Sequence, residues 1–282
     1  MSQGGRVARR TVSFHSRNRD QIQMKIVTWN VNSLNIRLPR LIAWLAANAP
    51  DVVCLQETKM EDAKFPVAAL EAAGYAAHYT GQKTYNGVAI LVRHGRAAGD
   101  VAAGIDGYGD EQKRLLAVTV DGIRIISAYV PNGQAVDSDK YRYKLAWCAA
   151  VTAHLRDALL HHPALAIAGD FNVAPDDRDV HDTALWAGQI LCSEPERAAF
   201  RGFLATGLTD SFRLFDQPPK TFSWWDYRQL AFPKNHGLRI DHILLSTPLA
   251  ERCASSRIDR NARKGEKPSD HAPAMVELRE AH

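Results

Sequence analysis

Leu165-Ala166-Ile167-Ala168-Gly169-Asp170-Phe171-Asn172 is the stretch that decides the fold of this chain. A continuous apolar run of this length, with a glycine near its end, is typical of a strand buried on both faces of a sheet. Such a strand has no place for spare polar groups, so we expect Asp170 and Asn172 at its carboxyl end, where open α/β sheets collect ligands. Side chains two positions apart point to the same side, so the carboxylate and the amide are expected to converge.

The segments around this strand alternate between strand and helix patterns. Strands are predicted at residues 25–30, 52–56, 87–92, 115–120, 124–129, 164–169, 238–246 and 272–278, and helices at 37–49, 66–73, 140–162 and 195–205. Asp121-Gly122 indicates a hairpin with a type I′ turn between two of the strands. Hairpins are thus mixed with helical crossovers, which excludes a single parallel sheet built from βαβ repeats. The pattern favours an α/β fold in which two sheets pack face to face with helices outside.

The composition indicates a sizeable core. Hydrophobic residues make up 46% of the 282 residues, enough for one large domain or two small ones. No apolar run approaches the roughly 18 residues that a transmembrane helix needs. The four cysteines show no CxxC or zinc-ligand spacing, so we expect them to be reduced in a cytoplasmic protein.

The first 23 residues differ from the rest of the chain. They are rich in Arg and Ser, and their five arginines and one aspartate account for the whole formal net charge of +4. We expect residues 1–23 to be a disordered basic tail, a transit-like leader or the product of a misassigned start upstream of Met24, and we favour the last. Residues 24–282 would form a single, formally neutral domain, in which a DNA-binding face requires local clustering of Lys and Arg.

Polar residues that a core would not select occur at the ends of several predicted strands. They are Asn30, Asn32, Glu57, Tyr129, Asp170, Asn172, Asp241, Asp270 and His271. Any single Asn or Asp at such a place is more commonly a turn residue. Together they supply hard oxygen ligands, hydrogen-bond donors and one imidazole, which suits Mg²⁺ or Mn²⁺ acting on a phosphate better than zinc.

Eight short motifs that contain these residues resemble, in order, those of the exonuclease III type of apurinic/apyrimidinic endonuclease, a branch of the endonuclease/exonuclease/phosphatase superfamily. They are WNVN (29–32), LQETK (55–59), NGVA (86–89), YVPN (129–132), GDFN (169–172), SWWDYR (223–228), GLRID (237–241) and KPSDHAP (267–273). One such motif is weak evidence, but eight collinear motifs from Met24 to about Leu278 are specific. The resemblance implies a four-layer sandwich of two packed mixed β-sheets flanked by helices.

The same resemblance implies a monomeric, Mg²⁺-dependent hydrolase of phosphodiesters in double-stranded DNA with abasic sites or nicks, with Mn²⁺ as a possible substitute metal. Glu57 would ligate the metal, with Asn32 and Asp270 near it. Asp170 would orient and deprotonate the attacking water, and His271, held by Asp241, would contact the phosphate. Whether Asp170 or His271 is the base stays open. Hydrogen bonds to the phosphate would come from Asn30, Asn172 and Tyr129.

Further residues would contact the DNA. In the family the loop that here contains Trp224 lines the pocket for the base-less sugar, whereas Trp225 is equally compatible with a core aromatic cluster. The candidates for contacts with backbone phosphates are Lys59, Lys83, Arg114, Arg228 and Arg239. His181 stands where the family varies and some members have a small residue. We expect it to affect the handling of internal abasic sites relative to blocked 3′ ends.

Two alternatives to a DNA repair nuclease remain at this point. A phosphatase of the same superfamily acting on a non-DNA phosphoester would keep the catalytic residues, but the loop of Trp224 and the motif at 237–241 argue against it. A nucleic-acid-binding module without catalysis would lack a catalytic residue, and none is missing from the motifs.

Overall fold

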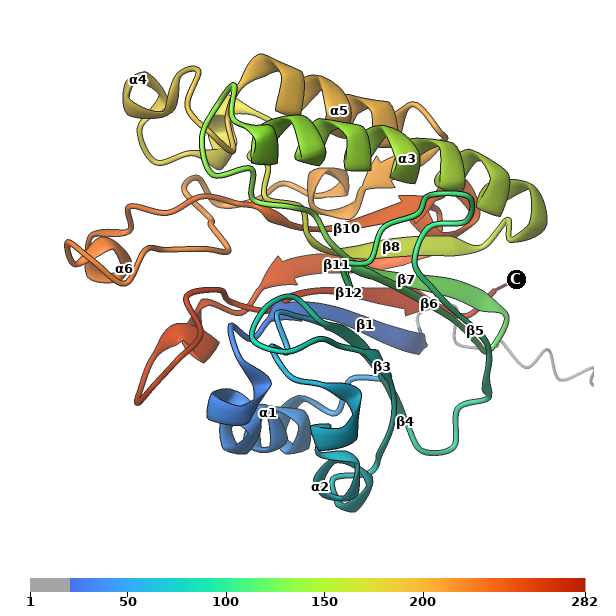
Figure 1. The fold of residues 1–282 in the computed structure, drawn as a ribbon. Helices are drawn as coiled ribbons and strands as arrows, with labels where there is room; N and C mark the ends of the chain where they lie inside the picture. The colour runs from blue at the N-terminus through green and yellow to red at the C-terminus, as the bar shows by residue number, and fades with distance from the viewer. Residues whose placement is uncertain (1–20, 282) are drawn as a thin grey trace, which may run out of the picture.

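The computed structural model describes residues 21–281 and contains two six-stranded sheets packed face to face (Figure 1). The first, the β1 sheet, has the strand order β11 (Cys253–Ile258), β12 (Ala274–Arg279), β1 (Ile22–Asn30), β2 (Val52–Gln56), β4 (Val88–Arg93) and β3 (Tyr75–Thr80). The second, the β8 sheet, has the order β5 (Ala98–Ala103), β6 (Leu115–Val120), β7 (Ile123–Tyr129), β8 (Leu165–Asp170), β10 (Asp241–Ser246) and β9 (Leu208–Asp210). Within each sheet one pair of strands is parallel, β1 with β2 and β7 with β8, and the other pairs are antiparallel.

Helices cover the outer face of each sheet (Figure 1). The β1 sheet is covered by α1 (Leu34–Asn48) and α2 (Val67–Ala72), and the β8 sheet by α3 (Asp139–His161) and α5 (Glu194–Leu204). Short elements lie in the connections: α4 (Thr183–Trp186), α6 (Ala231–Lys234), α7 (Thr247–Ala250), η1 (Asp62–Lys64), η2 (Asp177–Asp179), η3 (Ser211–Leu214) and η4 (Arg260–Arg263). The predicted four-layer sandwich is therefore confirmed. Within residues 21–281, no helix combines the length and the apolar character needed to cross a membrane.

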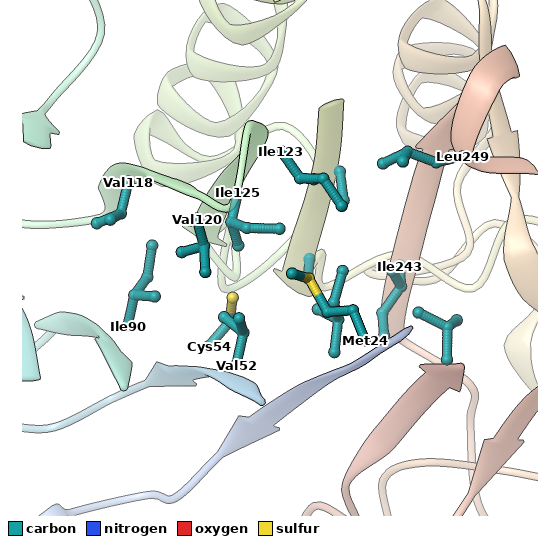
Figure 2. Packing of buried hydrophobic residues seen from close by; sticks show 14 of the residues in the cluster. Met24, Val52, Cys54, Ile90, Val118, Val120, Ile123, Ile125, Ile243 and Leu249 are labelled. Atoms are coloured by element: carbon teal, nitrogen blue, oxygen red, sulfur yellow. The ribbon is translucent and has the colours of Figure 1, made fainter. Parts of the chain in front are cut away.

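The space between the two sheets is filled mainly by aliphatic side chains (Figure 2). Met24, Val52 and Ile90 from the β1 sheet face Val118 and Ile125 from the β8 sheet. Their complete burial is the main contribution to the contact between the sheets, because burying such a side chain stabilises the fold by about 1.5–3 kcal/mol. The four cysteines are buried and unpaired, as predicted: Cys54, Cys148, Cys192 and Cys253.

A short polar chain crosses this apolar layer. The Thr28 hydroxyl donates to Gln56 Oε1 at 3.2 Å, and Gln56 Nε2 donates to Ser127 Oγ of the other sheet at 3.1 Å. Ser127 Oγ in turn donates to the carbonyl oxygen of Leu55 at 3.3 Å. These three polar side chains are fully buried, and their mutual hydrogen bonds offset the desolvation that burial imposes.

The structure differs from the predicted elements at several edges. β1 begins at Ile22, and the side chain of Gln23 accepts a hydrogen bond from Arg252, so the predicted tail of residues 1–23 extends too far. Residues 1–20 lie outside the described part of the chain. β10 begins at Asp241 rather than at 238, because Leu238 pairs with Val180 and Trp224 in isolated bridges. The sequence does not predict β3, β5, β9 or β11, which lie at or near the sheet edges.

Candidate active site

Both sheets present polar strand ends at the same edge of the sandwich. β1 and β2 are parallel, with Asn30 opposite Gln56, so Asn30 and the adjacent Glu57 leave the β1 sheet together. In the β8 sheet Asp170 is opposite both Tyr129 and Asp241. Gly169 permits this close pairing, since a Cβ at that position would collide with the carbonyl oxygen of Ala128. The topology alone thus gathers carboxylates, amides and a phenol at one place.

Asp170 lies at the centre of this group and is 1% exposed. Its carboxylate accepts hydrogen bonds from Asn30 Nδ2 and from the backbone N–H of Asn172, both at 2.9 Å. Burial, assisted by the negative charges of Asp241 and Glu57, raises the pKa of Asp170 to about 7, against the lowering effect of His271 and Asn30. A carboxylate with a pKa near neutrality is well suited to accept a proton at physiological pH.

His271 is held by Asp241. Its Nδ1 lies 2.9 and 3.1 Å from the two oxygens of the Asp241 carboxylate, and its Nε2 lies 3.8 Å from Asp170 Oδ2. Burial by itself would lower the pKa of His271, but the negative charges of Asp241 and Asp170 outweigh it and raise the pKa to about 10. His271 is therefore a cation at neutral pH. Among residues 21–281, Nε2 has no hydrogen-bond partner, which leaves this N–H available to an anionic ligand.

Glu57 accepts three hydrogen bonds. Its Oε1 receives Asn30 Nδ2 and the Tyr129 hydroxyl, both at 2.9 Å, and its Oε2 lies 2.7 Å from Lys59 Nζ. Burial tends to raise the pKa of Glu57, but the charge of Lys59 and the amide of Asn30 lower it below its usual value. Asn30 divides its two N–H groups between Glu57 and Asp170, so one amide joins the two sheets.

Asn32, Lys59 and Asp270 continue the polar group. Lys59 Nζ donates to Asn32 Oδ1 at 2.6 Å, and Asn32 Nδ2 donates to Asp270 Oδ1 at 2.9 Å. The predicted metal ligands Glu57, Asn32 and Asp270 are thus linked by hydrogen bonds. They offer hard oxygen donors, the set that Mg²⁺ prefers, and the ammonium of Lys59 already stands between two of these oxygens, so the residues fit a divalent cation.

A second group of potential ligands lies deeper in the site. Asp170, Asp241 and His271 place one ligand atom each within 4.8 Å of one another, and all three side chains are buried. The Nδ1 atom of His271 is already engaged by Asp241, as in a His held for hydrogen bonding or proton transfer. This group is therefore arranged for hydrogen bonding and proton transfer rather than for a second cation.

Asn172 has left-handed backbone geometry (φ 48°), which turns the chain sharply after β8. Its side-chain amide donates to the carbonyl oxygen of Val130 at 2.9 Å and to Asp170 Oδ2 at 3.3 Å, and its Oδ1 accepts from Asn132 Nδ2 at 3.1 Å. Asn132 was not predicted as a site residue, although it follows β7 as Asn172 follows β8. The repeated pattern of an asparagine after a strand end was the signal for it.

The aromatic residues after residue 222 divide between the site and the core. Trp224 is half-buried and donates from Nε1 to Asp270 Oδ2 at 3.1 Å, whereas Trp225 is fully buried in an apolar cluster with Phe222 and Ala272. Trp225 is thus a core residue, one of its two expected roles. Gly237 lies against both tryptophans, where a Cβ would approach Trp225 Nε1 to 2.5 Å and the Trp224 carbonyl oxygen to 2.8 Å.

His181 lies next to this aromatic loop. Its backbone N–H donates to the carbonyl oxygen of Gly237 at 3.1 Å, and its ring stacks on His236 with a centroid distance of 4.7 Å and an interplanar angle of 9°. Partial burial lowers the pKa of His181, so its imidazole is uncharged at neutral pH. Isolated bridges connect this position to His271: they run from Val180 to Leu238, from Leu238 to Trp224 and from Trp224 to His271.

The candidates for contacts with backbone phosphates separate into different environments. Arg239 is the exception to the prediction: it is 1% exposed and paired with Asp179 and Asp210, so it is a structural residue and cannot reach DNA. Arg114 lies over the ring of Tyr129 at 4.7 Å and lines the adjoining cavity, which has a volume of about 690 Å³. Lys59 and Lys83 line a smaller depression, and the exposed Arg228 pairs with Asp226.

Comparison with known proteins places this geometry in a wider context. The family model described as "Endonuclease/Exonuclease/phosphatase family" matches residues 27–271. Exodeoxyribonuclease III of Haemophilus influenzae is 35% identical over 91% of this chain and 100% of its own length. A solved structure of the 3′ phosphatase NExo from Neisseria bound to product DNA hairpin is 46% identical, covers 91% of this chain and 99% of its own, and has a TM-score of 0.88. An AP endonuclease from Archaeoglobus fulgidus is 37% identical, with coverage of 91% and 99% and a TM-score of 0.86.

Proposed function

Since the chain belongs to the endonuclease/exonuclease/phosphatase family, we propose that it is a DNA repair nuclease. It would hydrolyse phosphodiesters 5′ to abasic sites and remove 3′ blocking groups or 3′ nucleotides. It would act as a monomer, with Mg²⁺ as its metal. The observation that carries this proposal is the meeting of Asp170, Glu57 and the Asp241–His271 pair at one edge of two sheets. Relatives named as exodeoxyribonuclease, AP endonuclease and 3′ phosphatase support it.

In the proposed reaction Asp170 orients a water molecule and accepts its proton as the water attacks phosphorus. Asp170 is a better base than His271, because the charges of Asp241 and Asp170 keep His271 protonated. The His271 imidazolium donates from Nε2 to a phosphate oxygen while Asp241 holds Nδ1. Asn172 and Tyr129, whose donors now face neighbouring oxygens, would turn them to the phosphate when DNA binds.

The metal would be held by Glu57, with Asn32 and Asp270 beside it. When bound, Mg²⁺ neutralises phosphate charge and stabilises the leaving oxygen. Lys59 has to leave its place between Glu57 and Asn32 for this, and a backbone phosphate is a suitable new partner for its ammonium.

A paired assay tests the proposed function. The protein is incubated with a duplex that contains one internal abasic site and with a nicked duplex that ends in a 3′-phosphate, each with Mg²⁺ and with EDTA. We expect Mg²⁺-dependent cleavage or dephosphorylation that EDTA abolishes. If neither substrate reacts while a non-DNA phosphoester is hydrolysed, the superfamily phosphatase replaces this proposal.

His181 provides a further part of the proposal, the preference between the two substrates. We propose that its ring, which stacks on His236, takes up space that an extrahelical sugar at an internal abasic site would need. A 3′ terminus is free at one end and approaches with less hindrance. We therefore expect 3′-end processing to exceed cleavage at internal abasic sites.

Replacement of His181 by Gly tests this preference. The rate at the internal abasic site, relative to that at the 3′-phosphate, is expected to rise about tenfold or more, the scale on which pocket volume discriminates between substrates. The matched control is His94→Gly, because His94 is an exposed histidine on a distant surface, paired with Glu71. An unchanged ratio of the two rates in His181→Gly would remove His181 from this role.

A further inference from the structure

Lys144 is a lysine in an unusual place. It belongs to the buried stripe of α3 formed with Tyr141, Cys148, Val151 and Leu155, and its side chain is 0% exposed. A lysine is almost never fully buried unless it is paired, because removing its charge from water costs several kcal/mol. Its environment must therefore hold partners that offset this cost.

The three N–H groups of the ammonium all have partners. One pairs with Glu196 of α5, one donates to the carbonyl oxygen of Asn172 at 2.6 Å, and one donates to that of Asn132 at 3.2 Å. Glu196 is also 0% exposed and accepts from the backbone N–H groups of Leu191 and Ser193, within the capping box that begins α5. The ion pair is thus part of a fully satisfied buried network.

Two of these partners, the carbonyl oxygens of Asn132 and Asn172, lie in the loops that follow β7 and β8. The carbonyl oxygen of Asn172 belongs to the residue with left-handed geometry, whose side-chain amide contacts Asp170 Oδ2 and whose N–H donates to Asp170 Oδ1. The carbonyl oxygen of Asn132 belongs to the residue that fixes Asn172 Oδ1. One cation therefore holds both asparagines through their backbone carbonyl oxygens.

From this geometry we infer that Lys144 is a positioning residue for the nuclease reaction, acting through Asn172 on the orientation of Asp170. The inference rests on the proposed function. A buried ion pair that only joined α3 to α5 would need Glu196 alone, whereas here the ammonium also bridges the two loops of the site. The carboxylate of Glu196 neutralises the charge of Lys144, so no unpaired cation is buried.

The test is the double variant Lys144→Met/Glu196→Gln, which removes both charges so that no unpaired carboxylate stays buried. We expect kcat on the 3′-phosphate substrate, at saturating Mg²⁺, to fall about 10–100-fold, the usual effect of losing a group that orients a site residue. KM is expected to stay unchanged. In an Asn172→Ala background the same double change should cost little further activity, because the two act on one element.

The matched control is Arg96→Met. Arg96 pairs with the buried Asp51 at 2.8 Å, at the opposite end of β2 from Glu57, and Arg93 still pairs with Asp51 when Arg96 is removed. We expect this change to lower the melting temperature and to leave kcat as in the wild type. Lys144→Arg is the second variant, since it keeps a cation beside Glu196 and so favours folding, but its planar guanidinium cannot reproduce both carbonyl contacts.

Hydrogen exchange gives a readout that does not depend on activity. The amide of Asn172, protected by Asp170 Oδ1, should exchange faster in the Lys144 variants than in the wild type or in Arg96→Met. An inactive wild-type protein would refute the proposed function but leave this comparison intact. Wild-type kcat together with wild-type exchange at Asn172, in any folded Lys144 variant, would overturn the inference.

Discussion

Replacement of Asp170 by Asn is expected to abolish turnover and to stabilise the protein. The change keeps the shape of the side chain but removes the proton acceptor, and positioned bases contribute about 10²–10⁴ in rate, or about 3–5 kcal/mol. The residual kcat is therefore expected to be below about 1% of the wild type. DNA affinity should be retained, because the carboxylate repels the phosphate rather than binding it.

The stability effect follows from the buried charge. A pKa raised from 3.8 to about 7 means that ionised Asp170 costs the folded state about 4 kcal/mol at pH 8. The substitution by Asn removes this cost. It also loses about 1–3 kcal/mol of stability, because the NH₂ group of the new side chain cannot accept the hydrogen bonds that Asn30 and Asn172 donate to Asp170. The net gain should raise the melting temperature by at least about 2 °C at pH 8.

The sign of this effect depends on pH. The folded-state pKa of Asp170 is above its unfolded value, so its charge destabilises the fold above the unfolded pKa, and the penalty shrinks to about 1 kcal/mol at pH 4.5. Melting curves in EDTA at the two pH values measure it, with Asp216→Asn as control, because Asp216 is exposed and has no hydrogen-bond or ion-pair partner among residues 21–281. A lower melting temperature of Asp170→Asn at pH 8, or activity above a few per cent, would refute the reasoning.

Glu57→Ala should raise the Mg²⁺ concentration for half-maximal rate at least about tenfold; an unchanged Mg²⁺ titration would exclude Glu57 as a ligand. Arg239→Met should destabilise the fold by about 3–5 kcal/mol at pH 8 in urea denaturation, because it leaves the buried Asp210 without its ion pair and removes one of the two arginines that pair with Asp179. Burial tends to raise the pKa of Asp210, but the charge of Arg239 lowers it below its usual value. The stabilisation is therefore present above the unfolded pKa of about 4 and is lost as pH falls through the folded pKa. An equal loss of stability in Arg239→Met at pH 8 and at pH 3 would contradict the ion-pair account. Deletion of residues 1–20 should leave nuclease activity nearly unchanged, whereas a fall in both DNA affinity and its salt dependence would make this segment a DNA-binding arm.

The central part of this fold was predictable because its strands have strong local patterns. The segments 52–56 and 115–120 coincide with β2 and β6, and Asp121-Gly122 forms the expected turn with both φ values positive. The edge strands β5 and β11 were not predictable, because their sequences, AGDVAA and CASSRI, lack an apolar alternation and depend on pairing with a neighbour.

The site was predictable as a set of residue types but less so in its supports. Asp170, Asp241 and His271 come together as their strand ends suggest. Arg239 and Lys144 were not predictable, because an Arg or Lys in the sequence is normally expected at the surface, and only tertiary pairing with Asp179, Asp210 or Glu196 makes their burial possible.

The hydrogen bonds among Thr28, Gln56 and Ser127 have a consequence for the alignment of the two sheets. Contact between aliphatic side chains has no direction, so two apolar sheet faces can shift relative to each other with little change in free energy. Hydrogen bonds do have direction, so the bonds from Thr28 to Gln56 and from Gln56 to Ser127 hold the two sheets in one position relative to each other. Gln56 directly precedes Glu57, and Ser127 lies in β7, which ends at Tyr129, so these hydrogen bonds fix the offset between the site residues of the β1 sheet and those of the β8 sheet.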